Sequence, residues 1–381
     1  MVSRYRWRIQ YDWNGTESER REQDILVRQS PNIYDLFVVL AHASLVYEKH
    51  ALGAAWWIIS DPSESDLPGI LFLIMSIFVM SPIFFISGFL APSSQKNKNS
   101  WGFIKSKFRR LIIPWIIAVL TLIPLYKVIF LYSRNLPQEA WTTYFHWNSL
   151  WSQNWLWFLP VIFLFDLLYL FISKLDIKMP NLTLKGAIWV TFLVSYAFGF
   201  CMDCFILHDW TKTILVDFQN EKLLIYLMVF LLGVVCFKLK VFESDWKNKK
   251  LDITLHCTGW IPLNIYIYFV IYNLIKPDDP LISEVVDTLL VRLNYMLSLA
   301  YLLYILIISF KNYLNKQTKI SKALNANSYS VYIIHVIVMG ALALPMLNSI
   351  IPSLLRFLIL TVGTWVVSNL IVSVYRRVIN N

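Results

Sequence analysis

Five ionisable side chains interrupt long apolar stretches of the sequence, where a charge is costly. They are Asp35, His42, Asp166, Arg292 and His335. Each such group in hydrocarbon costs about 3 kcal/mol or more, so it usually faces a cavity or takes part in function. A pairing of Asp166 with Arg292 across two helices is one expected way to reduce that cost. These residues are therefore the first candidates for a functional site.

His42 has the best setting for proton transfer among these candidates. It lies in the apolar run 36–44, and Asp35 precedes it by seven residues on the same helical face. Seven residues are two turns, about 10 Å, so Asp35 can share a polar cavity with His42 but cannot bond to its ring directly. An imidazole suits the removal of a hydroxyl proton near neutral pH, because its reference pKa is about 6.5. A bond from the ring to a backbone carbonyl of a neighbouring helix is the equal alternative.

Composition and pattern place these candidates in a membrane protein. Of the 381 residues, 57% are hydrophobic and 15% are charged, whereas soluble domains contain about 45–50% apolar residues. A helix needs about 20 apolar residues to cross the hydrocarbon. Windows of this kind lie near residues 33–52, 69–91, 111–132, 155–173, 185–202, 223–239, 257–275, 289–310, 328–348 and 355–375. The sequence therefore predicts an all-α, polytopic transmembrane bundle with about ten spans.

The basic residues predict the orientation of these spans. Most of the 34 Lys and Arg residues fall in alternate segments, starting with the N-terminal one, and such residues collect on the cytoplasmic side. An even number of spans then places both termini in the cytoplasm. We expect a cytoplasmic tail at residues 1–31 and one integral membrane domain at 32–381. The net charge of +10 indicates attraction to anionic membrane lipid and not to nucleic acid.

The four cysteines give little support for a metal site. Cys201 and Cys204 form one Cys-x-x-Cys pair, and His208 follows four residues later. A lone pair of this type is weak evidence for metal binding or redox chemistry. We therefore expect these thiols to pack between helices, and we expect no metal. The sequence also contains no Gly-x-Ser-x-Gly motif, so a serine hydrolase of the usual kind is not indicated.

Four segments between residues 35 and 335 share their order and spacing with a known family. The first runs from Asp35 to His42 and Ser44. The second is PIFFISGFL at 82–90, followed by the basic segment FIKSKFRRLIIPW at 103–115. The third is LWFLP at 156–160, and the fourth is NSYSVYIIH at 327–335. Together they resemble the acyltransferase family 3 membrane proteins, which include O-acetyltransferases of bacterial surface polysaccharides and glucans.

The resemblance implies an O-acyltransferase of the plasma membrane that has no bound cofactor. It would move an acyl group, expected to be acetyl, from acyl-CoA to a hydroxyl of a carbohydrate or glycan acceptor. His42 would act as general base or carry the acyl group briefly, and Asp35 would belong to the same site. The residues expected to line the substrate site are Ser87, Trp157, Tyr332 and His335. Those expected to bind the phosphates of acyl-CoA are Lys105, Lys107, Arg109 and Arg110, and for these four a purely topological role is the alternative.

Three positions depart from the family pattern. Members usually carry an arginine about eleven residues before the histidine, whereas the nearest one here is Arg28. An Arg-x-x-Arg pair is replaced by Lys107 and Arg110, and Trp155 stands where a histidine is common. These departures keep open a relative that has lost catalysis. A polytopic transporter or exporter of glycan or lipid-linked substrate is a further alternative, although the sequence lacks the internal repeats that mark many transporters.

Overall fold

The structure, a computed structural model, is built almost entirely of α-helices. It describes residues 31–49, 56–96, 98–145, 153–175, 183–242, 249–313, 319–347 and 349–380. The expected tail at 1–31 lies outside these ranges apart from its last residue. Among the described residues one short antiparallel hairpin occurs, formed by β1 (Trp210–Lys212) and β2 (Asp217–Gln219).

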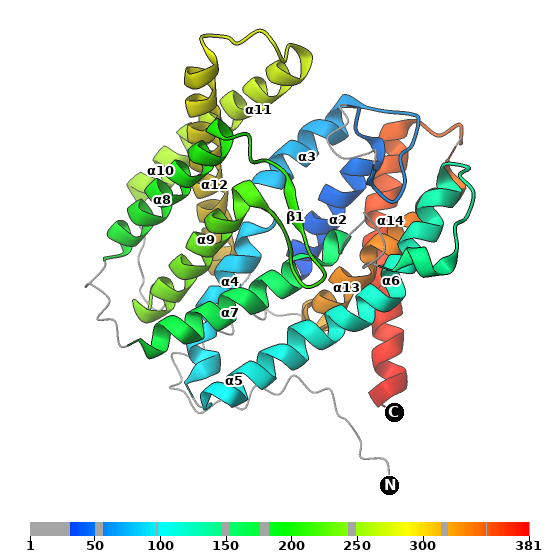
Figure 1. Ribbon diagram of the computed structural model, residues 1–381, viewed down its shortest axis with the longest axis horizontal. Helices are drawn as coiled ribbons and strands as arrows, with labels where there is room; N and C mark the ends of the chain where they lie inside the picture. Colours follow the sequence, from blue (N-terminus) through cyan, green and yellow to red (C-terminus); the bar gives the residue numbers. More distant parts are fainter. Residues whose placement is uncertain are drawn as a thin grey trace.

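The helices follow one another along the chain and differ in length (Figure 1). Their bounds are α2 Pro31–Tyr47, α3 Asp66–Phe78, α4 Ser81–Gln95, α5 Ser100–Lys107, α6 Ile113–Ser133, α7 Phe158–Lys174, α8 Leu184–Cys204, α9 Asn220–Lys238, α10 Lys249–Thr258, α11 Trp260–Ile275, α12 Glu284–Tyr313, α13 Lys319–Ala343 and α14 Ser353–Asn380. Short 3₁₀ helices cover Trp141–Tyr144, Asn154–Leu156 and Leu344–Met346, and a π-helical segment covers Phe108–Ile112.

Nine helical stretches of the described chain are long and apolar enough to cross a membrane. They correspond to the second to tenth windows expected from the sequence. The first window contains α2, an apolar helix of 17 residues, whose length is about 25 Å at 1.5 Å per residue. The predicted polytopic helical bundle is therefore confirmed, and the chain is a multi-pass membrane protein. The orientation of the spans and the limits of the membrane domain stay predictions.

The span at Ser100–Ser133 is not a uniform α-helix. It passes from α5 through the π-helical segment into α6, which has Pro114 in its first turn. Proline has no amide hydrogen to donate to the carbonyl four residues earlier, which belongs to Arg110. The hydroxyl of Tyr329 on α13 donates to that carbonyl oxygen at 2.7 Å. The helix α13 thus supplies a hydrogen bond to the carbonyl group of Arg110, to which Pro114 cannot donate.

The helices pack as two groups that share α3 (Figure 1). In one group α13 lies against α2, α6 and α14, and α2 also contacts α14. In the other group α9 lies against α4 and α8, and α12 lies against α8 and α11. Because α3 contacts α2 on one side and both α11 and α12 on the other, it joins the two groups.

Glycines allow α4 and α9 to approach too closely for side chains at the contact. A Cβ added to Gly88 of α4 would lie 1.9 Å from the carbonyl oxygen of Phe230, and one added to Gly233 of α9 would lie 2.2 Å from that of Phe85. Small residues at such contacts let helix backbones pack directly in the membrane. The motif glycine of segment 82–90 therefore has a packing role.

We expect Gly233→Ala to lower the free energy of unfolding by about 2 kcal/mol, because the added methyl group overpacks the contact between α4 and α9. Thermal unfolding of the purified protein in detergent measures the loss. Gly363→Ala is the matched control, since a Cβ there would meet Leu342 at an ordinary 3.6 Å. Equal midpoints for the two variants would contradict the close approach.

Candidate active site

One stretch of α13, residues 328–335, hydrogen-bonds to three separate parts of the chain. Its bonds run from Ser328 to the carboxylate of Asp35 at 2.6 Å, from Tyr329 to the carbonyl of Arg110 at 2.7 Å, from Tyr332 to the carbonyl of Trp155, and between His335 and His42 at 2.7 Å. The indole of Trp155 also donates to the carbonyl of Ile333 at 3.0 Å. The fourth sequence segment thus contacts the first, the basic part of the second, and the residue that precedes the third.

The two histidines meet edge to edge. Nδ1 of His42 lies 2.7 Å from Nε2 of His335, the ring planes differ by 16°, and the ring centroids are 4.9 Å apart. Two nearly coplanar imidazoles joined by one N–H···N bond have this geometry. His335 is fully buried, whereas His42 keeps part of its surface exposed. A substrate that enters the site would therefore reach His42 first.

A short segment beyond the C-terminal end of α2, residues 56–61, covers the other side of His42. The indole of Trp57 lies nearly parallel to the His42 ring, with centroids 4.8 Å apart, and Trp57, Ile58 and Ile59 are almost completely buried.

Three long side chains hold this segment in place. Tyr126 donates to the carbonyl of Trp56 at 2.7 Å, Arg134 donates to that of Trp57 at 3.0 Å, and Arg356 donates to the carboxylate of Asp61 at 2.5 Å. The Arg356–Asp61 pair is itself buried. The segment is therefore a fixed wall of the histidine site.

Asp35 lies in the interior two turns before His42 on α2, and its bonding partner is Ser328. Its second carboxylate oxygen has no hydrogen-bond partner among the described residues. Asp35 and His42 of α2 therefore both bond to α13. Their partners there, Ser328 and His335, are also seven residues apart. This agrees with the sequence argument that Asp35 does not bond to the imidazole.

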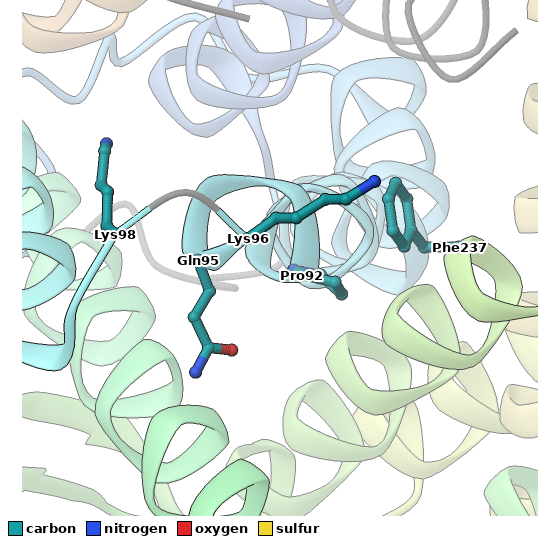
Figure 2. A pocket seen from close by; sticks show the side chains of 5 residues that line it. All are labelled: Pro92, Gln95, Lys96, Lys98 and Phe237. Carbon is teal, nitrogen blue, oxygen red and sulfur yellow. The ribbon is translucent and has the colours of Figure 1, made fainter. Parts of the chain in front are cut away.

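Three of the four expected phosphate-binding residues, Lys105, Arg109 and Arg110, line one of two adjacent hollows at the ends of α4, α5 and α9. One hollow, of about 350 Å³, is lined by Lys98, Gly102, Lys105, Ser106, Arg109 and Arg110. The other, of about 500 Å³, is lined by Pro92, Gln95, Lys96, Lys98 and Phe237 (Figure 2). Lys98 belongs to both hollows, and its ammonium group donates to Ser106 at 3.1 Å.

The positive field of this region acts on Lys98 itself. Partial burial lowers the pKa of Lys98, and repulsion from Arg110 and Lys107 lowers it further. Clustered cations of this kind attract polyanions. The sequence analysis did not select Lys98, although it lies only seven residues from Lys105.

Lys107 differs from its neighbours, because its ammonium group turns into the bundle. It lies 2.8 Å from Asp166 of α7, and the two side chains are 12% and 0% exposed. Arg292 instead bonds to Asp203 in a two-pronged contact and reaches Glu221 at 3.2 Å. The expected pairing of Asp166 with Arg292 was therefore wrong, because each has another partner that the sequence could not place beside it.

Asp203 and Glu221 also stand beside His208, and ligand atoms of the three residues lie within 4.8 Å of one another. Such a set could hold a metal ion by spacing alone. Arg292 donates to both carboxylates, however, and Lys222 lies 4.0 Å from Glu221, so two cations already accompany the two carboxylates. The arrangement is an ion-pair network that joins α8, α9 and α12.

Two expected substrate residues have neighbours other than the histidine pair among the described contacts. Trp157 packs against Phe84, Tyr226 and Trp210, with ring centroids 6.3, 5.9 and 5.4 Å away. Ser87 is half-buried on α4 beside the glycine that contacts α9. Tyr332, in contrast, lies next to His335, with their rings 5.4 Å apart.

Trp57, Tyr126 and Arg356 were missed by the sequence analysis. One signal for Arg356 existed, because it is a basic residue at the end of a span on the face expected to be poor in such residues. Nothing in the sequence singles out Trp57 or Tyr126 from the many other aromatic residues.

The structure is a bundle of membrane-spanning helices that encloses two histidines in hydrogen-bond contact. The model of one family, described as an acyltransferase domain, matches residues 36–373. The chain therefore belongs to acyltransferase family 3, and the resemblance seen in the four segments is confirmed. No curated protein and no solved structure matches the chain.

We expect Asp166→Ala to lower the free energy of unfolding by about 3 kcal/mol, because it leaves the ammonium group of Lys107 buried without its partner. The midpoint of thermal unfolding in detergent measures the effect. Combining Lys107→Met with Asp166→Leu removes both charges and should restore most of the loss. Fully additive losses in the double variant would show that the two side chains do not act as a pair.

Proposed function

We propose that the protein transfers an acyl group from acyl-CoA to a hydroxyl group of a carbohydrate or glycan acceptor, with His42 as the general base. One observation carries the proposal. His42 is the partly exposed member of a buried histidine pair, at the place where α2 and α13 bring two of the family's motif segments together. Membership of acyltransferase family 3 supports the acyl transfer itself.

In the proposed reaction His42 takes the proton of the acceptor hydroxyl as its oxygen attacks the thioester carbonyl carbon. The carbon–sulfur bond then breaks, and the departing sulfur takes the proton back from the imidazolium. The products are an ester of the acceptor and free CoA, so one proton passes through the imidazole and none is consumed. In the alternative, a ring nitrogen of His42 attacks the thioester carbon and the carbon–sulfur bond breaks, which gives an acyl-imidazole and the CoA thiolate. The acceptor oxygen then attacks the acyl carbon, the carbon–nitrogen bond breaks, and the hydroxyl proton passes to the CoA sulfur, so the products are the same.

The donor's phosphates would bind at the hollow lined by Lys98, Lys105, Arg109 and Arg110. Basic side chains provide charge-assisted bonds to phosphate oxygens, and the three residues selected from the sequence are exposed. Lys107 is left out of this set, because it bonds to Asp166. The wider basic region would also interact with anionic lipid of the plasma membrane, which is the proposed location.

The central test is transfer of radiolabelled acetyl from acetyl-CoA to glycan or lipid-linked material by membranes that contain the protein. Wild type is expected to label an acceptor, and His42→Ala is expected to abolish labelling because the base is missing. His256→Ala is the matched control, since His256 is an exposed histidine of α10 that bonds to the carbonyl of Asp252. Both variants must be present in membranes at the wild-type level.

Activity that survives in His42→Ala would reject the role of His42. If no acetyl, succinyl or longer acyl-CoA labels an acceptor with wild type, the proposed transfer is wrong for this chain. Retained binding of CoA without turnover would then identify a relative that has lost catalysis.

We expect Arg109→Ala to raise the KM for acyl-CoA about tenfold with little change in kcat, because one charge-assisted phosphate bond is worth about 1.5 kcal/mol or more. Initial rates over a range of donor concentrations measure both constants. Lys250→Ala, which removes an exposed charge from α10, is the control and should leave KM unchanged. A fall in kcat at constant KM would place Arg109 outside donor binding.

A further inference from the structure

The hydrogen bonds of His335 determine where its proton lies. Nδ1 of His335 lies 2.6 Å from the carbonyl oxygen of Tyr332, one turn earlier on α13. A carbonyl oxygen can only accept a hydrogen bond, so Nδ1 must carry the proton. In a neutral imidazole the other nitrogen, Nε2, is then bare and can only accept.

The proton position on His42 follows from its partner. Nε2 of His335 lies 2.7 Å from Nδ1 of His42, and a bare nitrogen at that distance requires a donor. Nδ1 of His42 therefore carries a proton, which leaves Nε2 of His42 as the bare, basic nitrogen of the pair.

A charged His335 would reverse this arrangement. Its Nε2 would donate to Nδ1 of His42, and Nε2 of His42 would then carry the proton and could not act as a base. His335 is fully buried, and its hydrogen bonds within the described chain go to a carbonyl and to an imidazole, with no carboxylate among them. Burial of an unpaired charge is costly, so the neutral form is favoured.

From this geometry we infer that His335 is a positioning residue, which fixes the tautomer of His42 so that Nε2 faces the substrate as the base. The inference rests on the proposed function for its catalytic meaning. His42 is the partly exposed ring and His335 the fully buried one, so His335 acts through His42 and does not touch the acceptor itself. This differs from the substrate-binding role expected from the sequence.

His335 would also act during the transfer. When Nε2 of His42 takes the acceptor's proton, the His42 ring becomes positive, and its Nδ1–H bond to His335 becomes charge-assisted and therefore stronger. When the leaving sulfur takes that proton back, the original neutral pair is restored. No other group needs to gain or lose a proton.

The surroundings hold His335 in the required orientation. The hydroxyl of Tyr332, whose carbonyl accepts from His335, bonds to the carbonyl of Trp155, and the indole of Trp155 donates back to the carbonyl of Ile333. Phe158 packs against the Tyr332 ring with centroids 4.4 Å apart. Two reciprocal hydrogen bonds and one aromatic contact thus fix the turn of α13 that carries His335, whose Nε2 accepts the hydrogen bond from His42.

Two isosteric substitutions at position 335 separate positioning from packing. The side-chain oxygen of His335→Gln would lie near the position of Nε2 and could accept from His42. The amide of His335→Asn would lie near the position of Nδ1, where its NH2 group can donate to the Tyr332 carbonyl, but it could not reach His42. We expect His335→Gln to keep kcat within about tenfold of wild type. His335→Asn and His335→Leu should lose about 100-fold or more in kcat, with the KM for acyl-CoA unchanged.

Equal losses in the Gln and Asn variants, at wild-type levels of folded protein, would show that His335 is needed for packing or acts as the base itself. Either result would overturn the inference while leaving acyl transfer by wild type intact. Absence of transfer by wild type would instead reject the proposed function.

A measurement that does not depend on activity decides the tautomer directly. The chain has six histidines, so ¹⁵N NMR of histidine-labelled protein in detergent can resolve them, and the spectrum of His42→Asn identifies the His42 signals. We expect a protonated Nδ1 and a bare Nε2 for His42 in wild type. Loss of this pattern in His335→Leu would support the inference, whereas a protonated Nε2 in wild type would overturn it.

Discussion

The interior of a bilayer contains no water to bond with buried polar groups, so a polar group there is stabilised when it has a partner within the protein. This constraint shapes residues 328–335 of α13. Each of Ser328, Tyr329, Tyr332 and His335 bonds to a different residue, and their partners lie on α2, in the π-helical segment before α6 and just before α7. The polar bonds that satisfy α13 are therefore the same bonds that bring the parts of the site together. Positions that look like separate motifs along the chain form one connected network in the fold.

The same constraint explains the charged residues of the bundle. Lys107 meets Asp166, Arg356 meets Asp61, and Arg292 meets both Asp203 and Glu221. Each contact joins segments that are far apart in the sequence. Breaking a buried pair is costly, because it leaves a charge without compensation, even where the intact pair adds little stability. These pairs consequently fix which helices are neighbours, while the direct contact between α4 and α9 at Gly88 and Gly233 fixes how closely two of them approach.

The histidine pair and the basic hollows have different surroundings. Beyond the C-terminal end of α2, Trp57 covers the His42 ring, and the surrounding segment is held by Tyr126, Arg134 and Arg356. The ends of α4, α5 and α9 instead carry two hollows with exposed basic side chains around Lys98. The first region is thus a mostly apolar wall held by hydrogen bonds, and the second is a cationic surface. The proposal that the donor's phosphates bind at the hollows rests on this cationic surface.

The sequence by itself determined the class of fold, the approximate positions of the spans and the family, because hydrophobic length and local motifs are properties of adjacent residues. It also selected His42 as the first candidate for the site. It also predicted that Asp35 does not bond to the ring of His42, since helical geometry alone sets the distance between them. The tertiary structure decided which residues are partners. His42 and His335 are 293 positions apart, and Asp166 and Arg292 are both buried charges whose true partners depend on how helices are arranged around them. The role of Trp57 likewise follows from the path of a loop, which no pattern of hydrophobic residues encodes. Pairwise contacts between distant helices depend on the packing of the whole bundle, so the tautomer of His42 could be inferred only after that packing was known.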